Sequence, residues 1–320
     1  MPRTERAGLW FALAEVLAVG LVPAFSKYAV SRVDPLLYSA LAVCVAAAVS
    51  SGLAIARGEL AQVVDRRFVG WLVPISLLGT TATTLLLFIG SKLTDGVSSA
   101  LLLQSEPVYS LALTWLLWRR PVSPRQLAGT VLILLGIVLV LYDGTFRIGL
   151  GGLLILLAPL GWQISHLLAL RVMPPMSPYA LTAARYLYGG AGLVLVQALF
   201  GHASVRSLGP SAYAMAAFHG VVLFFFGTLL WYETIRRLDL PRATAIVTPC
   251  EPIMSLVLVW ALLRTLPNVY QAAGLLVLAP GMWLVVVRSR REREAEAAAV
   301  RQGKEAAEPA VEPPHAGLEL

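Results

Sequence analysis

A glutamate followed by a proline occurs twice inside apolar stretches of this chain, as Glu106-Pro107 and as Glu251-Pro252. A carboxylate inside a membrane would be costly, since insertion scales give roughly 2.5–3.5 kcal/mol for Asp at a helix centre. Acids kept at such positions usually face a cavity, where they can bind a cation or exchange a proton. The alternative is structural, because each proline frees a backbone carbonyl one turn earlier and the glutamate can simply bond nearby backbone. The sequence leaves both interpretations open.

The residues that follow each Glu-Pro pair keep one register, 145 positions apart, across two apolar stretches. A gapless match of this length indicates that the chain contains two copies of one unit. The matched pairs are Ser110 and Ser255, Leu111 and Leu256, Trp115 and Trp260, Arg119 and Arg264, Gln126 and Gln271, Ala128 and Ala273, Gly129 and Gly274, and Gly136 and Gly281.

The composition is that of a polytopic membrane protein. Hydrophobic residues make up 58% of the 320 positions, charged residues only 13%, and the mean hydropathy is +0.75, values far from those of a soluble domain. Segments of about 20 apolar residues are long enough to cross the hydrocarbon core. Ten such segments are predicted, at 9–29, 35–56, 68–90, 97–118, 124–142, 148–170, 178–199, 212–235, 243–263 and 268–287.

We therefore predict an all-α membrane protein of ten transmembrane helices, arranged as two five-helix repeats. Because five is odd, the second copy must enter the membrane in the direction opposite to the first, so the repeats are inverted. The first repeat is expected over 1–145 and the second over 146–288, with a disordered cytoplasmic tail at 289–320 that is rich in Ala, Glu and Pro. Inverted repeats of this kind recur in secondary transporters.

Lys and Arg residues are distributed unequally between the two sides of the predicted topology. With the N-terminus inside, the inner side receives 18 of them and the outer side 6, which predicts that both termini are cytoplasmic. The net charge of +7 is then a topology signal and an attraction to anionic lipid. The expected partners are a lipid bilayer and a small-molecule substrate, with no nucleic acid. A monomer and a homodimer both remain open.

The ten-span plan resembles the drug/metabolite transporter superfamily, specifically its EamA-type permeases. The resemblance covers about residues 8–288. It rests on Ser105-Glu106-Pro107 through Gln126-x-x-Gly129 and on the copy Glu251-Pro252 through Gln271-x-x-Gly274. It implies a permease for small organic metabolites, such as amino acids or amphipathic compounds, in the inner membrane of a prokaryote, with export as its direction.

Two features depart from the family pattern or differ between the halves. The family usually has Gly-Glu where the fourth and ninth spans end, whereas this chain ends them with Arg119 and Arg264. The family's common Arg near the start of the seventh span is matched by Arg185, while the corresponding place in the second span holds apolar Leu41 and Ala42.

Further candidates for substrate binding or proton coupling are the polar and aromatic groups at membrane depth. Trp162 and His166 share one face of the sixth span, with Gln163 beside them. Core packing is the alternative for Trp162, and a position at the membrane interface is the alternative for His166. Helix packing is the alternative for Gln104, and mutual pairing or contact with headgroups is the alternative for Glu15 and Arg185. The full set is Glu106, Glu251, Gln104, Trp162, Gln163, His166, Arg185, Glu15 and Tyr232, with Pro107 and Pro252 as helix kinks.

Enzymatic and cofactor-binding functions find no motif in the sequence. There is no phosphate-binding Gly-Lys-Ser/Thr loop, no His-Glu-x-x-His, no pair of cysteines at metal spacing and no Gly-x-Ser-x-Gly. We therefore expect no metal, no cofactor and no enzymatic activity. The prediction is a secondary active transporter with alternating access at a midplane cavity. Its alternatives are a lipid or multidrug translocator and an intramembrane enzyme that uses Glu106 and His166.

Overall fold

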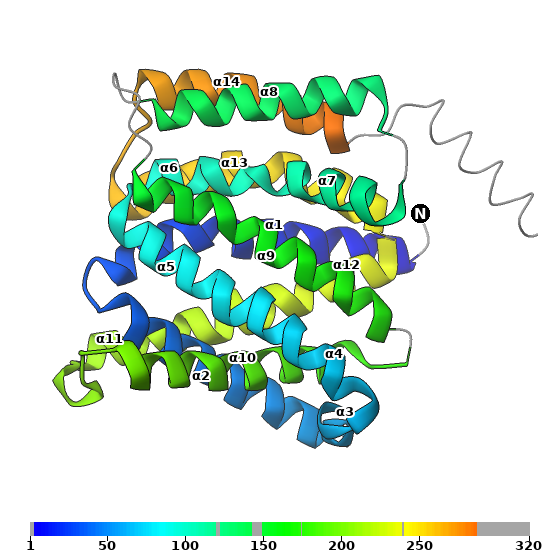
Figure 1. Ribbon diagram of the computed structural model, residues 1–320, viewed down its shortest axis with the longest axis vertical. Coiled ribbons are helices and arrows are strands. Elements are labelled where there is room, and N and C mark those ends of the chain that lie inside the picture. The colour runs from blue at the N-terminus through cyan, green and yellow to red at the C-terminus, as the bar shows by residue number, and fades with distance from the viewer. Residues whose placement is uncertain (1–2, 120–121, 143–148, 174, 239, 287–320) are drawn as a thin grey trace, which may run out of the picture. The chain divides into compact units, whose positions relative to one another are not determined.

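The computed structural model describes residues 3–119, 122–142, 149–173, 175–238 and 240–286 (Figure 1). Regular secondary structure in these ranges is helical, and they contain no strand, which confirms the all-helical prediction. The predicted tail at 289–320 lies outside the described residues.

Each half of the chain folds into a series of helices in which long segments are joined by short turns. The first half forms α1 (Arg3–Val30), α2 (Pro35–Ala56), α3 (Leu60–Val64), α4 (Arg66–Ser76), η1 (Leu77–Ala82), α5 (Thr83–Leu93), α6 (Gly96–Leu102), η2 (Leu103–Ser105), α7 (Glu106–Trp118) and α8 (Pro124–Leu141). The second half forms α9 (Leu150–Val172), α10 (Pro178–Phe200), η3 (Val205–Ser207), α11 (Pro210–Phe218), η4 (His219–Phe226), α12 (Gly227–Leu238), α13 (Leu240–Leu263) and α14 (Val269–Val286).

Several of these helices begin at one local sequence signal, a capping side chain followed by a proline. Asp34, Ser123 and Ser177 each accept hydrogen bonds from backbone N–H groups of the first turn of α2, α8 and α10, respectively. The proline that follows has no N–H group to lose and already has a helical φ. At α8 the Gln126 side chain also accepts from the Ser123 N–H, which completes a capping box.

Eight helical stretches are long and apolar enough to cross a membrane: Arg6–Val30, Pro35–Ala56, Arg66–Leu93, Pro124–Leu141, Leu150–Val172, Pro178–Phe200, Pro210–Thr234 and Val269–Val286. Within the described residues, Cys250–Leu263 is apolar but shorter. The predicted fourth span is divided by the 3₁₀ turn η2 just before Pro107, whereas α13 continues through Pro252. The structure thus establishes a multi-pass membrane protein but leaves the count of ten as a prediction.

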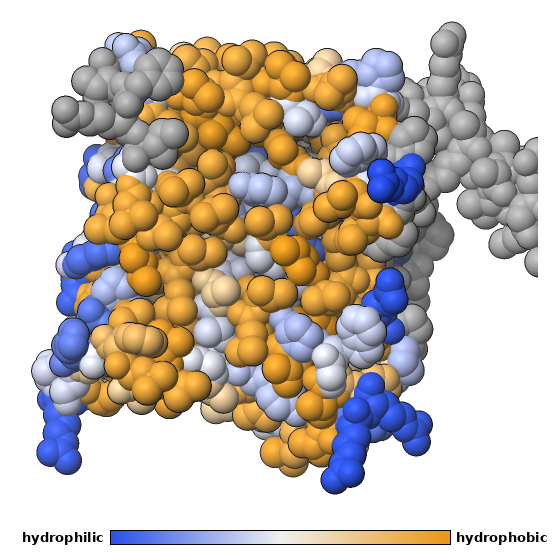
Figure 2. Space-filling model, viewed as in Figure 1, coloured by the Kyte–Doolittle hydropathy of each residue, from blue (hydrophilic) through white to orange (hydrophobic). Residues whose placement is uncertain are grey.

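The surface agrees with this assignment. In Figure 2, apolar residues cover most of the visible face, and hydrophilic residues gather at the left and right edges, where the helices of Figure 1 end. Large apolar side chains on α8 are between 47% and 60% exposed, namely those of Leu127, Val131, Leu134 and Leu135. Water would oppose such exposure, whereas lipid favours it.

Helices at equivalent places in the two halves pack against each other or in matching pairs. α8 packs against α14 and α2 against α10, and these two pairs lie at the top and bottom of Figure 1. α1 of the first half contacts α13 of the second, and α9, the counterpart of α1, contacts α7 of the first half. Such reciprocal pairing is what an approximate two-fold relation between two copies produces.

The contact between α8 and α14 uses the glycines that the repeat brings into register. A Cβ on Gly129 would lie 2.7 Å from the Gly281 carbonyl oxygen, and a Cβ on Gly136 would lie 2.9 Å from the Gly274 carbonyl oxygen. The earlier glycine of each helix therefore faces the later glycine of the other, so the helices are antiparallel. Equivalent helices that run antiparallel are what an inverted repeat requires, and small residues let their backbones approach closely.

Replacing Gly129 by Ala should destabilise the protein, because the added Cβ meets a backbone carbonyl that has no rotamer to yield. We expect a loss of about 1–3 kcal/mol, the usual cost of overpacking, seen as a lower apparent melting temperature in detergent. Gly52→Ala is the matched control. Gly52 is also helical but has open space at its Cβ position, so this change should stabilise slightly. Equal melting temperatures for the two variants would contradict the proposed close contact.

The predicted spans 68–90 and 212–235 each contain a π-helix, which hydrophobic periodicity did not predict. η1 and η4 occupy equivalent places in the two copies. A π turn leaves backbone carbonyls outside the α-helical pattern and often marks a functional segment. Two adjacent residues of α10 bond these carbonyls. Arg185 Nη2 donates to Gly79 O of η1 at 2.9 Å, and the Tyr186 hydroxyl donates to Phe224 O of η4 at 2.8 Å.

Arg119 and Arg264 follow α7 and α13 at equivalent positions, and both have a positive φ, 52° and 57°. They are the only non-glycine residues of the described chain with a left-handed backbone. Each donates its N–H to the tryptophan carbonyl four residues earlier, Trp115 or Trp260. The shared departure of both repeats from the family pattern thus coincides with a shared helix-ending conformation.

Arg119→Gly should stabilise the protein by about 1 kcal/mol, because a left-handed conformation costs an L-residue roughly that amount and costs glycine little. Arg264→Gly should gain less, since the Arg264 guanidinium also lies 5.4 Å from the centroid of the Trp260 ring, a contact worth about 0.5–1 kcal/mol. Melting curves of the two variants against wild type test this order. A drop in stability for Arg119→Gly would show that its side chain contributes more than its backbone costs.

Candidate functional site

Three buried or half-buried glutamates interact where helices of both repeats meet. Glu15 of α1 and Glu106 of α7 belong to the first repeat, and Glu251 of α13 belongs to the second. The charge of Glu106 acts on Glu15, and the charges of both act on Glu251. Like charges repel strongly in a medium of low dielectric constant, and protonation or a bound cation relieves that repulsion. The chemistry available to this acid cluster is therefore proton exchange or amine binding.

The hydrogen bonds of the acid cluster are incomplete. Gln163 of α9 donates from Nε2 to Glu106 Oε1 at 2.5 Å, which joins the two repeats directly. Glu15 is only 4% exposed, and its Oε2 has no partner among the described residues. A buried acceptor without a donor costs free energy. The acid cluster thus has unused capacity to accept hydrogen bonds.

Gln104 is buried two residues before the Glu-Pro pair, but its amide is used locally. Its Nε2 donates to Ala100 O of the same helical segment at 3.2 Å. This bond satisfies backbone near the 3₁₀ turn η2. The geometry therefore brings Gln163, rather than Gln104, into contact with Glu106.

α9 carries three of the predicted candidates. Gln163 is buried and faces Glu106, while Trp162 is half-buried and packs against the largest apolar core cluster. His166 is half-buried one turn further along, and the charge of Arg185 acts on it. Between them, the Ser165 hydroxyl donates to Ile75 O of α4 at 3.0 Å. α9 therefore connects the acid cluster with the surroundings of Arg185.

Arg185 of α10 is buried, 6% exposed, without a carboxylate partner among the described residues. Its Nε donates to Thr80 Oγ1 at 3.3 Å and its Nη2 to Gly79 O. The structure does not show the pairing with Glu15 that the sequence left open. A buried guanidinium held only by neutral acceptors retains most of its attraction for an anion.

Tyr232 and Glu233 of α12 lie near the C-terminal end of the predicted eighth span. Tyr232 is 4% exposed, and its hydroxyl has no partner among the described residues. Glu233 forms an ion pair with Arg237 and accepts a hydrogen bond from the Tyr179 hydroxyl at 3.1 Å. Glu233 is therefore structurally engaged, whereas the Tyr232 hydroxyl is available.

An aromatic cluster lies where α1, α2, α5 and η4 meet. His219 of η4 is fully buried, with its ring centroid 4.5 Å from Phe224 and 5.0 Å from Phe88. Its Nδ1 lies 3.3 Å from the Tyr38 hydroxyl, and Phe25 of α1 closes another side at 5.6 Å. Water or a solute could enter this part of the interior only by displacing these side chains.

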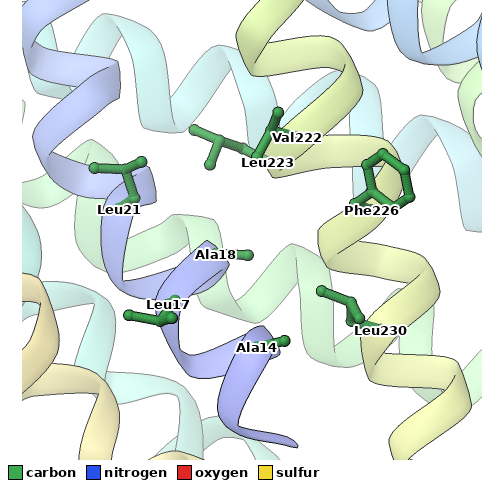
Figure 3. A pocket seen from close by; sticks show the side chains of 8 residues that line it. All are labelled: Ala14, Leu17, Ala18, Leu21, Val222, Leu223, Phe226 and Leu230. Atoms are coloured by element: carbon green, nitrogen blue, oxygen red, sulfur yellow. The ribbon is translucent and has the colours of Figure 1, made fainter. Parts of the chain in front are cut away.

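A lateral apolar groove runs between α1 and the η4–α12 segment (Figure 3). It encloses about 260 Å³. Figure 3 shows only hydrocarbon side chains along its walls. A second apolar cavity shares Ala14 and Leu230 with this groove and is also lined by Trp10. The groove residues are Ala14, Leu17, Ala18 and Leu21 of α1, and Val222, Leu223, Phe226 and Leu230 of the other wall.

Sequence reasoning missed the residues of the π turn. Gly79 and Thr80 hold Arg185, and a Cβ on Gly79 would lie 2.1 Å from Ser165 Oγ. The available signal was a run of small and polar residues, Gly79 to Thr84, inside an otherwise apolar span. Such a run is unnecessary for lipid contact and indicates close packing or polar bonding between helices.

The family comparison finds the same two repeats. The model of the EamA-like transporter family matches residues 6–142 and 149–287. The chain belongs to the EamA-like transporter family. Its general function as a multi-pass membrane transporter follows from that membership together with the apolar helices.

Three curated relatives are at most 24% identical to this chain and are named only as uncharacterized transporters. One from Archaeoglobus fulgidus is 23% identical over 68% of this chain and 77% of its own length. One from Methanothermobacter thermautotrophicus is 24% identical over 72% and 68%, and YyaM of Bacillus subtilis is 22% identical over 66% and 70%. A solved crystal structure aligns with a TM-score of 0.65 at 20% identity, over 89% of this chain and 98% of its own. That likeness concerns the fold alone.

Proposed function

We propose that this EamA-family protein is a secondary active exporter of small organic metabolites, coupled to protons through the acid cluster. The proposal includes ten spans in two inverted repeats, 1–145 and 146–288, with both termini on the cytoplasmic side of a prokaryotic inner membrane. Amino acids and amphipathic compounds are the substrate classes that the family resemblance implies. The direction of transport is likewise taken from that resemblance.

The observation that carries the proposal is the acid cluster at the contact between the repeats. Glu15 and Glu106 belong to one repeat and Glu251 to the other. A rocking motion of one repeat against the other would change the spacing of these carboxyl groups. Their repulsion depends on that spacing, so proton binding and repeat motion are thermodynamically linked. This linkage is what a proton-coupled transporter requires.

Burial of the site supports alternating access. Glu15 and Arg185 are nearly inaccessible, and the aromatic cluster around His219 fills the interior where α1, α2, α5 and η4 meet. A solute could reach these groups only after helices move, as in an occluded state of a transport cycle. The π turns of η1 and η4, placed equivalently in the two copies, are candidate hinges for that motion.

The lateral groove favours a second candidate, translocation of lipids or amphipathic drugs. Its walls are apolar, and Ala14 and Ala18 of α1 flank the buried Glu15 in sequence. An amphipathic amine could place its hydrocarbon part in the groove and its charged end toward that acid. Solutes that partition into lipid would then be favoured over polar metabolites.

Glu106→Gln and Glu251→Gln should fold, because the amide keeps the shape and most hydrogen bonds of the acid, but at least one should lose proton-driven flux. The measurement uses proteoliposomes that contain pyranine. An imposed pH gradient and externally added metabolite pools then report substrate-dependent proton movement. Wild type should respond to at least one pool, and the affected variant should show roughly a tenfold smaller response or none.

Glu59→Gln is the matched control for the two acid variants. Glu59 lies outside the spans, where it bonds Arg57 and Ser177, and its variant should keep the wild-type pH response. If both cluster variants transport at wild-type rates with the same pH dependence, the acids are packing elements and proton coupling through them is excluded.

The proposed orientation places the position after Leu320 in the cytoplasm and the position near Asp143 outside it. A fluorescent protein should therefore be active only when fused after Leu320, and alkaline phosphatase only when inserted near Asp143. Activity of both positions on the same side would rule out an inverted arrangement of the two repeats.

A further inference from the structure

We infer that the lateral groove binds one phospholipid with a negatively charged headgroup. Its acyl chain lies between α1 and the η4–α12 segment, and its phosphate lies at Arg6 and Arg237. The lipid is a resident ligand of the folded protein rather than a transported solute. This site depends on the membrane location of the helices and is independent of the transport function proposed above.

The groove is long enough for the hydrocarbon chain of one membrane leaflet. The cavity of Figure 3 and the second apolar cavity share Ala14 and Leu230, so the lining is continuous along α1 from Ala7 to Leu21. The 14 residue steps from Ala7 to Leu21 (21 − 7) correspond to roughly 21 Å of helix. One leaflet contributes about half of the hydrocarbon core, roughly 15 Å. An extended acyl chain can therefore lie in the groove over the full depth of its leaflet.

Small side chains on α1 give the groove its depth. Ala14 and Ala18 are four residues apart and therefore lie on one face of the helix. In Figure 3 their methyl groups point toward the opposite wall, and Leu230 points back toward α1. Beside them, Leu17 of α1 is 54% exposed and Phe226 of η4 is 45% exposed. A hydrocarbon chain between these side chains gains packing contacts that the protein itself leaves open.

Two arginines from different helices lie at the end of the groove where α1 begins. Arg6 is exposed and directly precedes Ala7, the first lining residue. The Arg237 guanidinium of α12 lies 4.4 Å from the centroid of the Phe11 ring, which lines the same cavity. α1 and α12 are in direct contact here, because a Cβ on Gly8 would lie 3.1 Å from Arg237 Cβ. Basic pockets between transmembrane helices are typical sites for anionic lipid headgroups.

Both arginines have donors available for a phosphate. The bonds of Arg237 to Glu233 use Nη1 alone, so its Nε and Nη2 have no acceptor within the described chain. Arg6 makes no ion pair within the described ranges. Two parallel N–H groups of a guanidinium match two oxygens of one phosphate. A phosphodiester headgroup is therefore the anion that suits this end of the groove.

Trp10 indicates that the arginine end of the groove lies at headgroup depth. It lines the second cavity, is 72% exposed and follows Arg6 by four residues, on the same face of α1. Tryptophan is enriched where the hydrocarbon meets the headgroups. Ala14 lies one helical turn further into the membrane. The order of charge, tryptophan and small apolar residues along α1 thus matches the order of headgroup, interface and acyl chain in a lipid.

The distribution of charge along the groove indicates that the lipid stays in one leaflet. All 8 residues that line the deeper cavity have hydrocarbon side chains. Beyond Leu21, the next basic residue of α1 is Lys27. A headgroup that moved through the groove would lose its arginine partners and find no polar side chain along the walls. The lipid is therefore held at the arginine end, in contact with α1 of one repeat and α12 of the other.

Lipid titration of the purified full-length protein in detergent tests the site. Native mass spectrometry counts bound phosphatidylglycerol, and melting curves report the stabilisation that a ligand of the folded state produces. Wild type should bind one phosphatidylglycerol roughly 25-fold more tightly than phosphatidylcholine, because each basic residue near an anionic headgroup contributes about fivefold. Arg6→Gln and Arg237→Gln should each reduce this preference about fivefold.

The Arg6 variant separates binding from folding. Arg237→Gln breaks the ion pair with Glu233 and can lower stability for that reason alone. Arg6 is exposed and makes no ion pair within the described ranges, so Arg6→Gln should keep the melting temperature of the lipid-free protein. Arg66→Gln is its matched control, since Arg66 of α4 is also exposed but lines neither cavity. This control should bind both lipids as wild type does.

Ala14→Leu tests the position of the acyl chain. The larger side chain would fill the part of the groove that both cavities share, so binding of phosphatidylglycerol should fall at least about tenfold, a typical cost of steric overpacking. Ala48→Leu makes the same change at an exposed alanine of α2 outside the groove. It should leave lipid binding unchanged.

Equal binding of the two lipids by wild type would overturn the site, as would unchanged binding in Arg6→Gln or Ala14→Leu, or an equal loss in Arg6→Gln and Arg66→Gln. Stabilisation by inorganic phosphate or glycerol phosphate that equals that by the lipid would show an anion site without an acyl chain, and would also overturn it. Fluorescent phosphatidylglycerol in proteoliposomes gives the last test. Movement between leaflets with wild type but not with Ala14→Leu would make the groove a translocation path and reject a resident lipid.

Discussion

The structure depends on one constraint: polar groups inside hydrocarbon must find their partners within the protein. The π turns η1 and η4 are where this constraint is most demanding, because their backbone carbonyls leave the α-helical pattern. Adjacent residues of α10, Arg185 and Tyr186, bond one turn in each repeat. α10 therefore bonds both π turns, and Arg185, one of the two residues that do so, is also a residue of the candidate site.

Duplication supplies the second organising element. Antiparallel equivalents can approach closely because the glycines of α8 and α14 leave their backbones almost in contact. The two copies differ where α10 and α2 meet the π turns. Arg185 reaches η1, but in the other half a Cβ on Gly220 of η4 would lie 2.4 Å from the Ala42 carbonyl oxygen, which leaves no space for a long side chain. The apolar residue in the second span thus follows from closer packing there.

The sequence was sufficient for the helical class, the repeat and the family, because these depend on hydropathy and on a register that both copies preserve. It was insufficient for the partners of single side chains. Glu106 bonds Gln163 on another helix, whereas Gln104, its neighbour in sequence, bonds its own backbone. Periodicity also treats η1 and η4 as ordinary helix, because it registers the spacing of apolar residues and not the pattern of backbone hydrogen bonds. Tertiary contacts decide both outcomes.

The asymmetry between the halves has a mechanistic consequence. The acid cluster draws on both repeats unequally, with Glu15 and Glu106 from the first and Glu251 from the second. Arg185 exists in one copy only, and it lies toward the N-terminal end of α10. The interior therefore carries its positive charge on one helix and its negative charges on others, and this distribution of charge is not repeated in the other half. A ligand with two opposite charges would therefore have one preferred orientation, and the two states of the transport cycle would not be equivalent for it.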